Sequence, residues 1–153
     1  DLKPENVLID YEESPIVIKL ADFGLSAHFK INFQYGLNEK MGTLLFMAPE
    51  QAKHQKYGKR IDIWACGIMM YETIEGGKHP ICDLNKDTEQ SFLQKLQNPS
   101  FTFSNNFTDL SKDFFLKLCT TSPIERYTSD QALRHPWITR NFSDPIPMTQ
   151  SDQ

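Results

Sequence analysis

The spacing of apolar residues changes along the chain, and each spacing predicts a different element. Two short apolar runs, 7–9 and 16–20, flank the polar stretch 10–15. They predict two strands that fold back on each other as a hairpin. Between residues 60 and 75, apolar side chains occupy nearly every face of a helix, and glycines follow at 76–77. This pattern predicts a buried helix that ends at those glycines.

The other apolar segments are amphipathic or irregular. Residues 88–96 and 110–119 carry apolar side chains at helical spacing and predict two helices that pack on the core with one face. Ser129 is expected to cap a further helix that starts at Asp130. By contrast, residues 25–47 lack a sustained period of either kind. Because long irregular segments inside compact domains are usually functional, we expect this one to have a role in activity.

Composition narrows the class of protein without identifying it. A chain of 153 residues that is 39% hydrophobic can bury one core. We expect one domain over residues 1–140 and a polar, flexible tail at 141–153. The net charge of -4 argues against a nucleic-acid partner, because such proteins present a basic face. No apolar run is long enough to cross a bilayer, so no membrane partner is expected.

The three cysteines are far apart and show neither a disulfide framework nor a zinc-binding spacing. They fit a reducing compartment, so a cytoplasmic location is expected, with the nucleus as an alternative. The four histidines also lack metal-ligand spacing, and none stands in a motif with a nucleophilic Ser or Cys. We expect them to be structural.

Polar residues with possible metal-binding chemistry flank the predicted hairpin. Asn6 directly precedes the first strand and Asp22 closely follows the second, so the hairpin would bring them together at its open end. An amide oxygen and a carboxylate can hold Mg²⁺ together with substrate phosphates. Asp1 lies nearby and remains available for a proton. The alternative is that Asp1 and Asn6 only stabilise turns, but this alternative does not require the acid at Asp22.

Several motifs resemble those of protein kinases. The stretch Asp1-Leu2-Lys3-Pro4-Glu5-Asn6 resembles the catalytic loop, in the form found in the serine/threonine branch, and Asp22-Phe23-Gly24 resembles the magnesium-binding loop. Residues 42–50 resemble the end of the activation segment, and residues 126–137 resemble the motif that closes the domain. The resemblance covers roughly residues 1–138 and leans toward the calmodulin-dependent group.

The resemblance implies the lower lobe of a kinase domain. This lobe is mainly α-helical, with a small β-hairpin beside the catalytic loop and a buried central helix, whereas a whole kinase domain would be α+β. The sequence contains no Gly-rich loop, strand lysine or helix glutamate for nucleotide binding. We therefore expect the upper lobe to be missing and this piece alone to be inactive.

The implied function is transfer of the ATP γ-phosphate to Ser or Thr hydroxyls of protein substrates, with ATP and Mg²⁺ as cofactors. Two alternatives remain open at this stage. One is a pseudokinase, which keeps the fold as a scaffold without transferring phosphate. The other is a helical docking module that binds no nucleotide.

The resemblance also implies a role for each matching residue. Asp1 would be the general base, and Lys3 would steady the transferred phosphoryl group. Asn6 and Asp22 would hold the metal ions that bridge the nucleotide phosphates. The Thr43 hydroxyl would bond to both Asp1 and Lys3.

Four residues match positions that contact the protein substrate. Leu44 and Leu45 would shape the pocket for the residue after the phosphoacceptor. Glu5 and Glu72 match acids that face arginines upstream of the target residue. The resemblance therefore implies a protein substrate that is basic near the target Ser or Thr.

Other matching residues would support the site. Gly24 completes the magnesium-loop motif, Glu50 would pair with Arg126, and Asp62 would bond to backbone groups of the catalytic loop. Glu39 stands where many family members carry a phosphorylatable Thr. Its single charge could keep the activation segment partly ordered without phosphorylation, or it could be an ordinary solvated loop charge.

Overall fold

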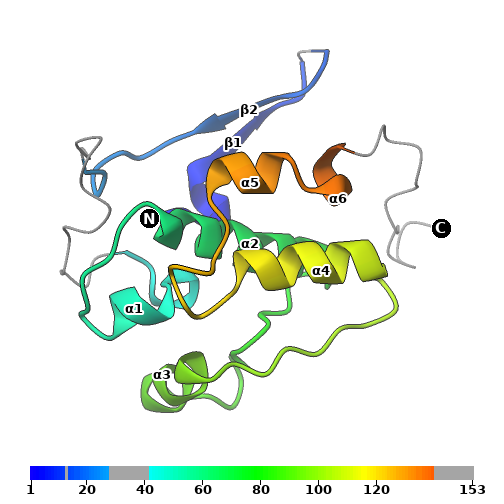
Figure 1. The fold of residues 1–153 in the computed structure, drawn as a ribbon. Coiled ribbons are helices and arrows are strands. Elements are labelled where there is room, and N and C mark those ends of the chain that lie inside the picture. Colours follow the sequence, from blue (N-terminus) through cyan, green and yellow to red (C-terminus); the bar gives the residue numbers. More distant parts are fainter. Residues whose placement is uncertain (13, 28–41, 140–153) are drawn as a thin grey trace.

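The computed structural model describes residues 1–12, 14–27 and 42–139 (Figure 1). These residues form two single-turn 3₁₀ helices, two strands and six α-helices: η1 (Pro4–Asn6), β1 (Val7–Asp10), β2 (Val17–Leu20), η2 (Leu44–Phe46), α1 (Pro49–Ala52), α2 (Arg60–Ile74), α3 (Glu89–Gln97), α4 (Asp109–Leu118), α5 (Ser129–Leu133) and α6 (Pro136–Thr139). The mainly α-helical fold with one hairpin is confirmed. The expected flexible tail at 141–153 lies outside the described residues.

The predicted hairpin is confirmed, with β1 antiparallel to β2 and Val7 opposite Leu20. Figure 1 shows it projecting from the helical body, and its apolar side chains are largely exposed, with Ile18 65% and Leu20 50% accessible. At its open end the Ala21 N–H donates to the Asn6 carbonyl oxygen at 2.9 Å. This bond fixes the two chain segments that carry the candidate metal ligands.

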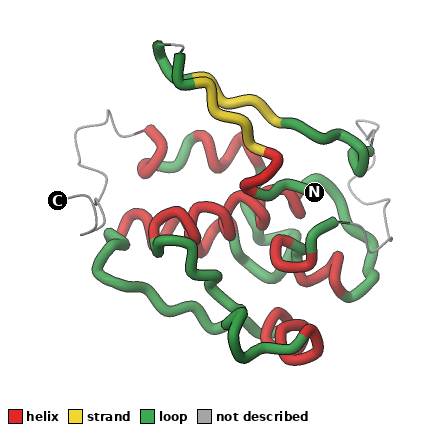
Figure 2. Tube along the Cα trace, turned by 180° about the vertical axis from the view of Figure 1, so that it is seen from behind, coloured by secondary structure: helices red, strands yellow, loops and turns green. Residues whose placement is uncertain are grey.

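Helix α2 runs through the middle of the molecule, between the hairpin and α3, and packs on α4 and η2 (Figures 1 and 2). Trp64 and Ile68 are fully buried on its packed side, while Cys66 is exposed. The predicted helix is therefore present, but it is not covered on every side. A Cβ on Gly67 would lie only 2.4 Å from the Cys119 sulfur, so the close approach of α4 requires glycine there.

Aromatic side chains from α2, α4 and the loop between α3 and α4 form much of the core. Their ring centroids lie 4.9–6.3 Å apart, mostly in tilted or edge-to-face arrangements that favour aromatic packing. The Tyr71 hydroxyl donates to the Thr102 carbonyl oxygen at 2.7 Å and so satisfies its polar end. The rings belong to Tyr71, Phe101, Phe103, Phe107 and Phe115.

The three helices α3, α4 and α5 each begin after a threonine that accepts a backbone hydrogen bond from the third residue of the helix. For α5 this N-cap is Thr128, so the prediction of Ser129 as the cap is wrong. Gln131 explains the difference, because its side chain accepts the Thr128 N–H at 2.8 Å while its own N–H donates to the Thr128 hydroxyl. This reciprocal capping box is available only to Thr128.

Candidate functional site

The segment before β1 folds into a compact turn that fixes Asp1 and Asn6 relative to each other. Pro4 starts the single turn η1, and the Asn6 N–H donates to the Lys3 carbonyl oxygen at 3.0 Å. The buried Asn6 side chain reaches back, and its amide nitrogen donates to the Asp1 carbonyl oxygen at 2.9 Å. Asn6 is therefore a structural part of the loop, with its amide oxygen directed away from this bond.

Lys3 and Thr43 hold the Asp1 carboxylate from two sides. The Lys3 ammonium lies 3.0 Å from Asp1 Oδ2 and also donates to the Thr43 hydroxyl at 3.0 Å. The second Asp1 oxygen, Oδ1, accepts the Thr43 main-chain N–H at 2.6 Å. The predicted contact between Thr43 and Lys3 is thus present. The predicted bond from the Thr43 hydroxyl to Asp1 is not, because the main-chain amide makes that contact instead.

Gly42 makes this amide contact possible, and the sequence reasoning did not identify it. Its φ of 109° lies in the region that favours glycine. A Cβ at Gly42 would also approach Asp1 Oδ1 to 3.3 Å. A side chain at this position would therefore strain the turn and crowd the carboxylate.

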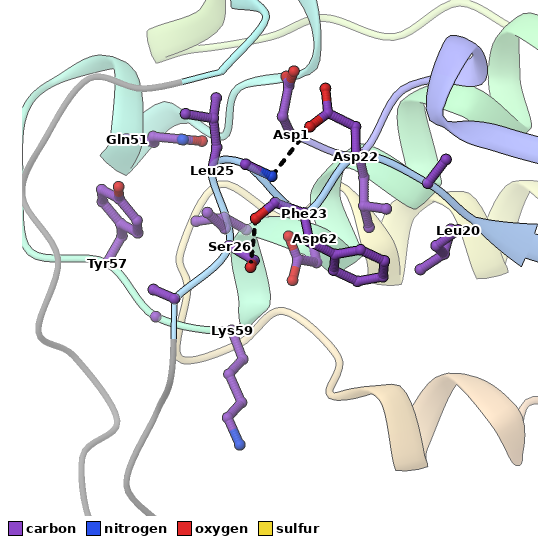
Figure 3. Close-up of a pocket in the computed structure, with 16 residues that line it drawn as sticks. Asp1, Leu20, Asp22, Phe23, Leu25, Ser26, Gln51, Tyr57, Lys59 and Asp62 are labelled. Carbon is purple, nitrogen blue, oxygen red and sulfur yellow. Dashed lines mark hydrogen bonds between the residues drawn. The ribbon is translucent and has the colours of Figure 1, made fainter.

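Asp22 lies two residues after the end of β2 in a left-handed backbone conformation, with φ 56°. Its Oδ1 accepts the Gly24 N–H at 3.1 Å, so its side chain closes the turn that follows. A Cβ on Gly24 would lie 3.1 Å from the same oxygen, so a side chain there would crowd the Asp22 carboxylate. Figure 3 shows the Asp1 and Asp22 side chains on the same side of the adjoining cavity.

Asn6 and Asp22 suit a hard cation that also takes ligands from phosphates and water. Within the described residues, no hydrogen bond uses the Asn6 amide oxygen or the second carboxylate oxygen of Asp22. No group of three or more His, Cys, Asp or Glu side chains in this part of the chain could hold a metal by itself. Two oxygen donors at one hairpin end fit Mg²⁺, which usually keeps one or two protein ligands and binds phosphate oxygens as well.

A cavity of about 620 Å³ adjoins these residues. Asp1, Asp22 and Asp62 contribute carboxylates to it, while Figure 3 shows the Lys59 side chain extending away from them. Of the other residues labelled there, Phe23 belongs to the magnesium-loop motif and is 66% exposed, and Ser26 is a candidate switch residue of the activation segment, whereas the sequence assigned no role in the site to the rest. These additional residues are Leu20, Phe23, Leu25, Ser26, Gln51, Tyr57 and Lys59.

Asp62 differs from its prediction. It projects from the first turn of α2 into the cavity, is exposed, and makes no hydrogen bond to the catalytic loop within the described residues. Burial by the surrounding protein still disfavours its charge and raises the pKa of the carboxyl. Within the described residues, the structure therefore does not contain the hydrogen bond expected between Asp62 and the catalytic loop.

The predicted substrate residues occupy two places. Leu44 and Leu45 form η2 and are half-buried against the core. Glu5 is exposed in η1, and Glu72 is half-buried on α2. Burial raises the pKa of Glu72, and the negative charge of Glu5 raises it further, so the two carboxylates lie within electrostatic reach of each other.

Glu50 and Arg126 form the expected ion pair beneath the site. Both side chains are buried, and the guanidinium group donates to the two carboxylate oxygens at 2.7 and 2.9 Å. Arg126 also donates to the carbonyl oxygens of Thr120 and Arg60, each at 2.9 Å, and lies over the Trp64 ring. The pair thereby connects α1, which follows the predicted substrate segment, to α2 and the loop after α4.

The expected switch residue Glu39 and the expected absence of a membrane partner are not tested by the described residues. Glu39 lies among residues 28–41, which are not described. Within the described residues, no helix is both long enough and apolar enough to span a bilayer.

Comparison with known proteins identifies the family. The model of the protein kinase domain matches residues 1–138. The chain is 34% identical to a probable myosin light chain kinase of Dictyostelium discoideum, over 94% of this chain and 36% of that protein. It is 33% identical to ribosomal protein S6 kinase alpha-1 of Rattus norvegicus, over 98% of this chain and 20% of that protein.

A third relative is the calcium/calmodulin-dependent protein kinase type II subunit delta of Oryctolagus cuniculus. It is 33% identical over 91% of this chain and 26% of its own length. The chain thus spans about a fifth to about a third of the length of these curated relatives. The match to the family model covers most of the chain, and the chain belongs to the protein kinase family.

Proposed function

We propose that this chain supplies the catalytic base, metal ligands and substrate-binding surface of a serine/threonine protein kinase. The observation that supports this proposal most strongly is the arrangement at Asp1. Its carboxylate lies between Lys3 and the Thr43 amide, while Asn6 and Asp22 approach from the open end of the hairpin. The proposed base Asp1, the positively charged Lys3 and the proposed metal ligands are therefore brought to one site by three separate segments of the chain.

Each residue has a defined part in the proposed transfer of phosphate to a hydroxyl. Asp1 would accept a hydrogen bond from the substrate hydroxyl and orient it for attack. Lys3, already paired with Asp1, would place its positive charge next to the transferred group. ATP would supply the phosphoryl group, and Mg²⁺ held by Asn6 and Asp22 would neutralise charge on its phosphates.

The proposed protein substrate carries a basic residue before the target Ser or Thr. Glu5 and Glu72 support this, because burial raises the pKa of Glu72 and the negative charge of Glu5 raises it further, which indicates that the two carboxylates lie close enough to repel each other. An arginine or lysine of the substrate placed near both would relieve the repulsion and gain charge-assisted hydrogen bonds. Peptides without this residue should therefore bind more weakly.

The test uses the full-length protein with Mg-ATP and peptides that present Ser, Thr or Tyr. We expect phosphate transfer to Ser and Thr, with strong loss in Asp22→Asn because a metal ligand is weakened. Asp109→Asn is the matched control, because Asp109 is an exposed α4 residue whose side chain, in the described part of the chain, makes a surface contact with Lys112. Nucleotide binding without any transfer by the wild-type protein would instead support the pseudokinase alternative and contradict the proposal.

A further inference from the structure

The end of α2 is built so that the following chain returns toward η2. Gly76 and Gly77 have φ values of 64° and 87°, which favour glycine, and the Gly77 N–H donates to the Glu72 carbonyl oxygen at 2.7 Å. His79 follows this turn and contacts η2. The glycine pair therefore brings a histidine to the segment that carries the predicted substrate pocket.

The hydrogen bonds of His79 define which ring nitrogen carries the proton. Nδ1 accepts the main-chain N–H groups of Ile81 and Cys82, at 3.1 and 2.9 Å. A nitrogen that accepts carries no proton, so in the neutral ring Nε2 carries it. Nε2 lies 2.9 Å from the Leu45 carbonyl oxygen and donates to it.

The Leu45 carbonyl group needs this partner because η2 does not use it internally. Within this single turn, the Phe46 N–H donates to the Thr43 carbonyl oxygen and the Met47 N–H to that of Leu44. His79 thus holds the Leu45 carbonyl group from outside the turn.

Phe92 of α3 fixes the ring further. Its own ring meets the His79 ring edge-on, with the centroids 5.6 Å apart. Burial lowers the pKa of His79, against a smaller opposite effect of the Leu45 bond. The ring is therefore neutral near pH 7, as its contacts require.

We propose that His79 is a positioning residue for the protein substrate, because it holds Leu45 so that Leu44 and Leu45 form a fixed apolar wall for the residue after the phosphoacceptor. This inference rests on the proposed kinase function. It adds that the accepted residue is apolar, since both wall residues are leucines that are half-buried against the core.

Two substitutions separate the contacts of His79. In His79→Asn, the side-chain oxygen can replace Nδ1 as acceptor for Ile81 and Cys82, but the side chain is too short to reach Leu45. In His79→Gln, the longer amide can donate to Leu45 but loses the acceptor position of Nδ1. If His79 had only a structural role, the loss of activity in each of the two variants would be proportional to its loss of stability.

His135→Asn is the matched control. His135 is also buried, accepts the Trp137 N–H with Nδ1 and contacts Asp113 with Nε2. It follows α5 and packs on Phe114, and within the described residues its hydrogen bonds and ring contacts do not involve η2. Its substitution should lower the melting temperature without changing the choice of peptide.

The assay compares peptides that differ only in the residue after the target Ser, leucine against glutamine, in the full-length protein. For His79→Asn we expect KM for the leucine peptide to rise roughly five- to tenfold, as for the loss of one positioning hydrogen bond, with kcat within about twofold. The preference for leucine should fall by a similar factor. His79→Gln should keep the preference even where it melts at a lower temperature.

Hydrogen exchange gives a second readout that does not depend on activity. Amides of residues 43–48 should exchange faster in His79→Asn than in the wild type, and at the wild-type rate in His135→Asn. Unchanged leucine preference in an active His79→Asn enzyme would overturn the inference. If the wild type phosphorylates no peptide, the kinase proposal itself fails. In that case hydrogen exchange still tests His79, because an unchanged rate at residues 43–48 in His79→Asn would overturn its role in holding Leu45.

Discussion

Replacing Arg126 with methionine should destabilise the fold strongly, because it leaves the buried Glu50 carboxylate without its cation. The Arg126 side chain is 0% exposed and that of Glu50 is 4% exposed. The substitution removes both bonds to Glu50 and the donors for the carbonyl groups of Thr120 and Arg60. Breaking a buried pair from one side costs about 3–5 kcal/mol. Against a typical stability of roughly 5–15 kcal/mol, this is a large fraction.

A second substitution separates the buried charge from general packing damage. Glu50→Gln alone should destabilise the protein, because it weakens two charge-assisted bonds to Arg126. In the Arg126→Met background the same change should restore about 1–3 kcal/mol, because it removes the unpaired charge. Urea unfolding followed by tryptophan fluorescence would measure all four proteins. Equal destabilisation by Glu50→Gln in both backgrounds would refute the reasoning.

Three further predictions concern packing, catalysis and substrate binding. Gly67→Ala should cost roughly 1–3 kcal/mol in urea unfolding, because its Cβ would meet the Cys119 sulfur at 2.4 Å, and Cys119→Ala should recover part of the loss. Thr43→Ala should lower kcat/KM roughly tenfold or more in peptide assays, because the Lys3 ammonium group loses the hydroxyl oxygen to which it donates. Thr43→Ser keeps that hydroxyl group and should retain most activity. Glu72 must be ionised to bind a cation, and burial, followed by the charge of Glu5, raises its pKa. As the pH is lowered, KM for arginine peptides should therefore begin to rise at a higher pH than it would if Glu72 had the ordinary pKa of a glutamate. An unchanged KM down to pH 5 would contradict this.

The elements with local patterns were predictable from the sequence. The hairpin follows from two apolar runs around a polar turn, and α2 follows from its apolar residues and the terminal glycines. The α5 cap was also readable, since Thr128 and Gln131 have the spacing of a capping box, whereas Ser129 does not. Thr128 and Ser129 both carry a hydroxyl group, and only the reciprocal partner Gln131 distinguishes the cap from its neighbour.

The detailed site could not be predicted, because it depends on contacts between distant segments. The Lys3–Thr43 contact joins residues 40 positions apart, and only the family resemblance suggested it. The amide contact to Asp1 depends on the φ angle of Gly42, which no hydrophobic pattern encodes. His79 showed no metal-ligand spacing, and its role in holding Leu45 becomes visible only when the two segments meet.

The most direct test of the central claim is phosphate transfer by the full-length protein before and after Asp1→Asn. The account predicts that wild-type protein transfers the ATP γ-phosphate to a Ser or Thr peptide in the presence of Mg²⁺. Asp1→Asn should reduce kcat about 10²–10⁴-fold while leaving nucleotide binding and melting temperature nearly unchanged, because the general base is lost but its surroundings remain. Transfer at the wild-type rate by Asp1→Asn would contradict the assignment of Asp1 as the base.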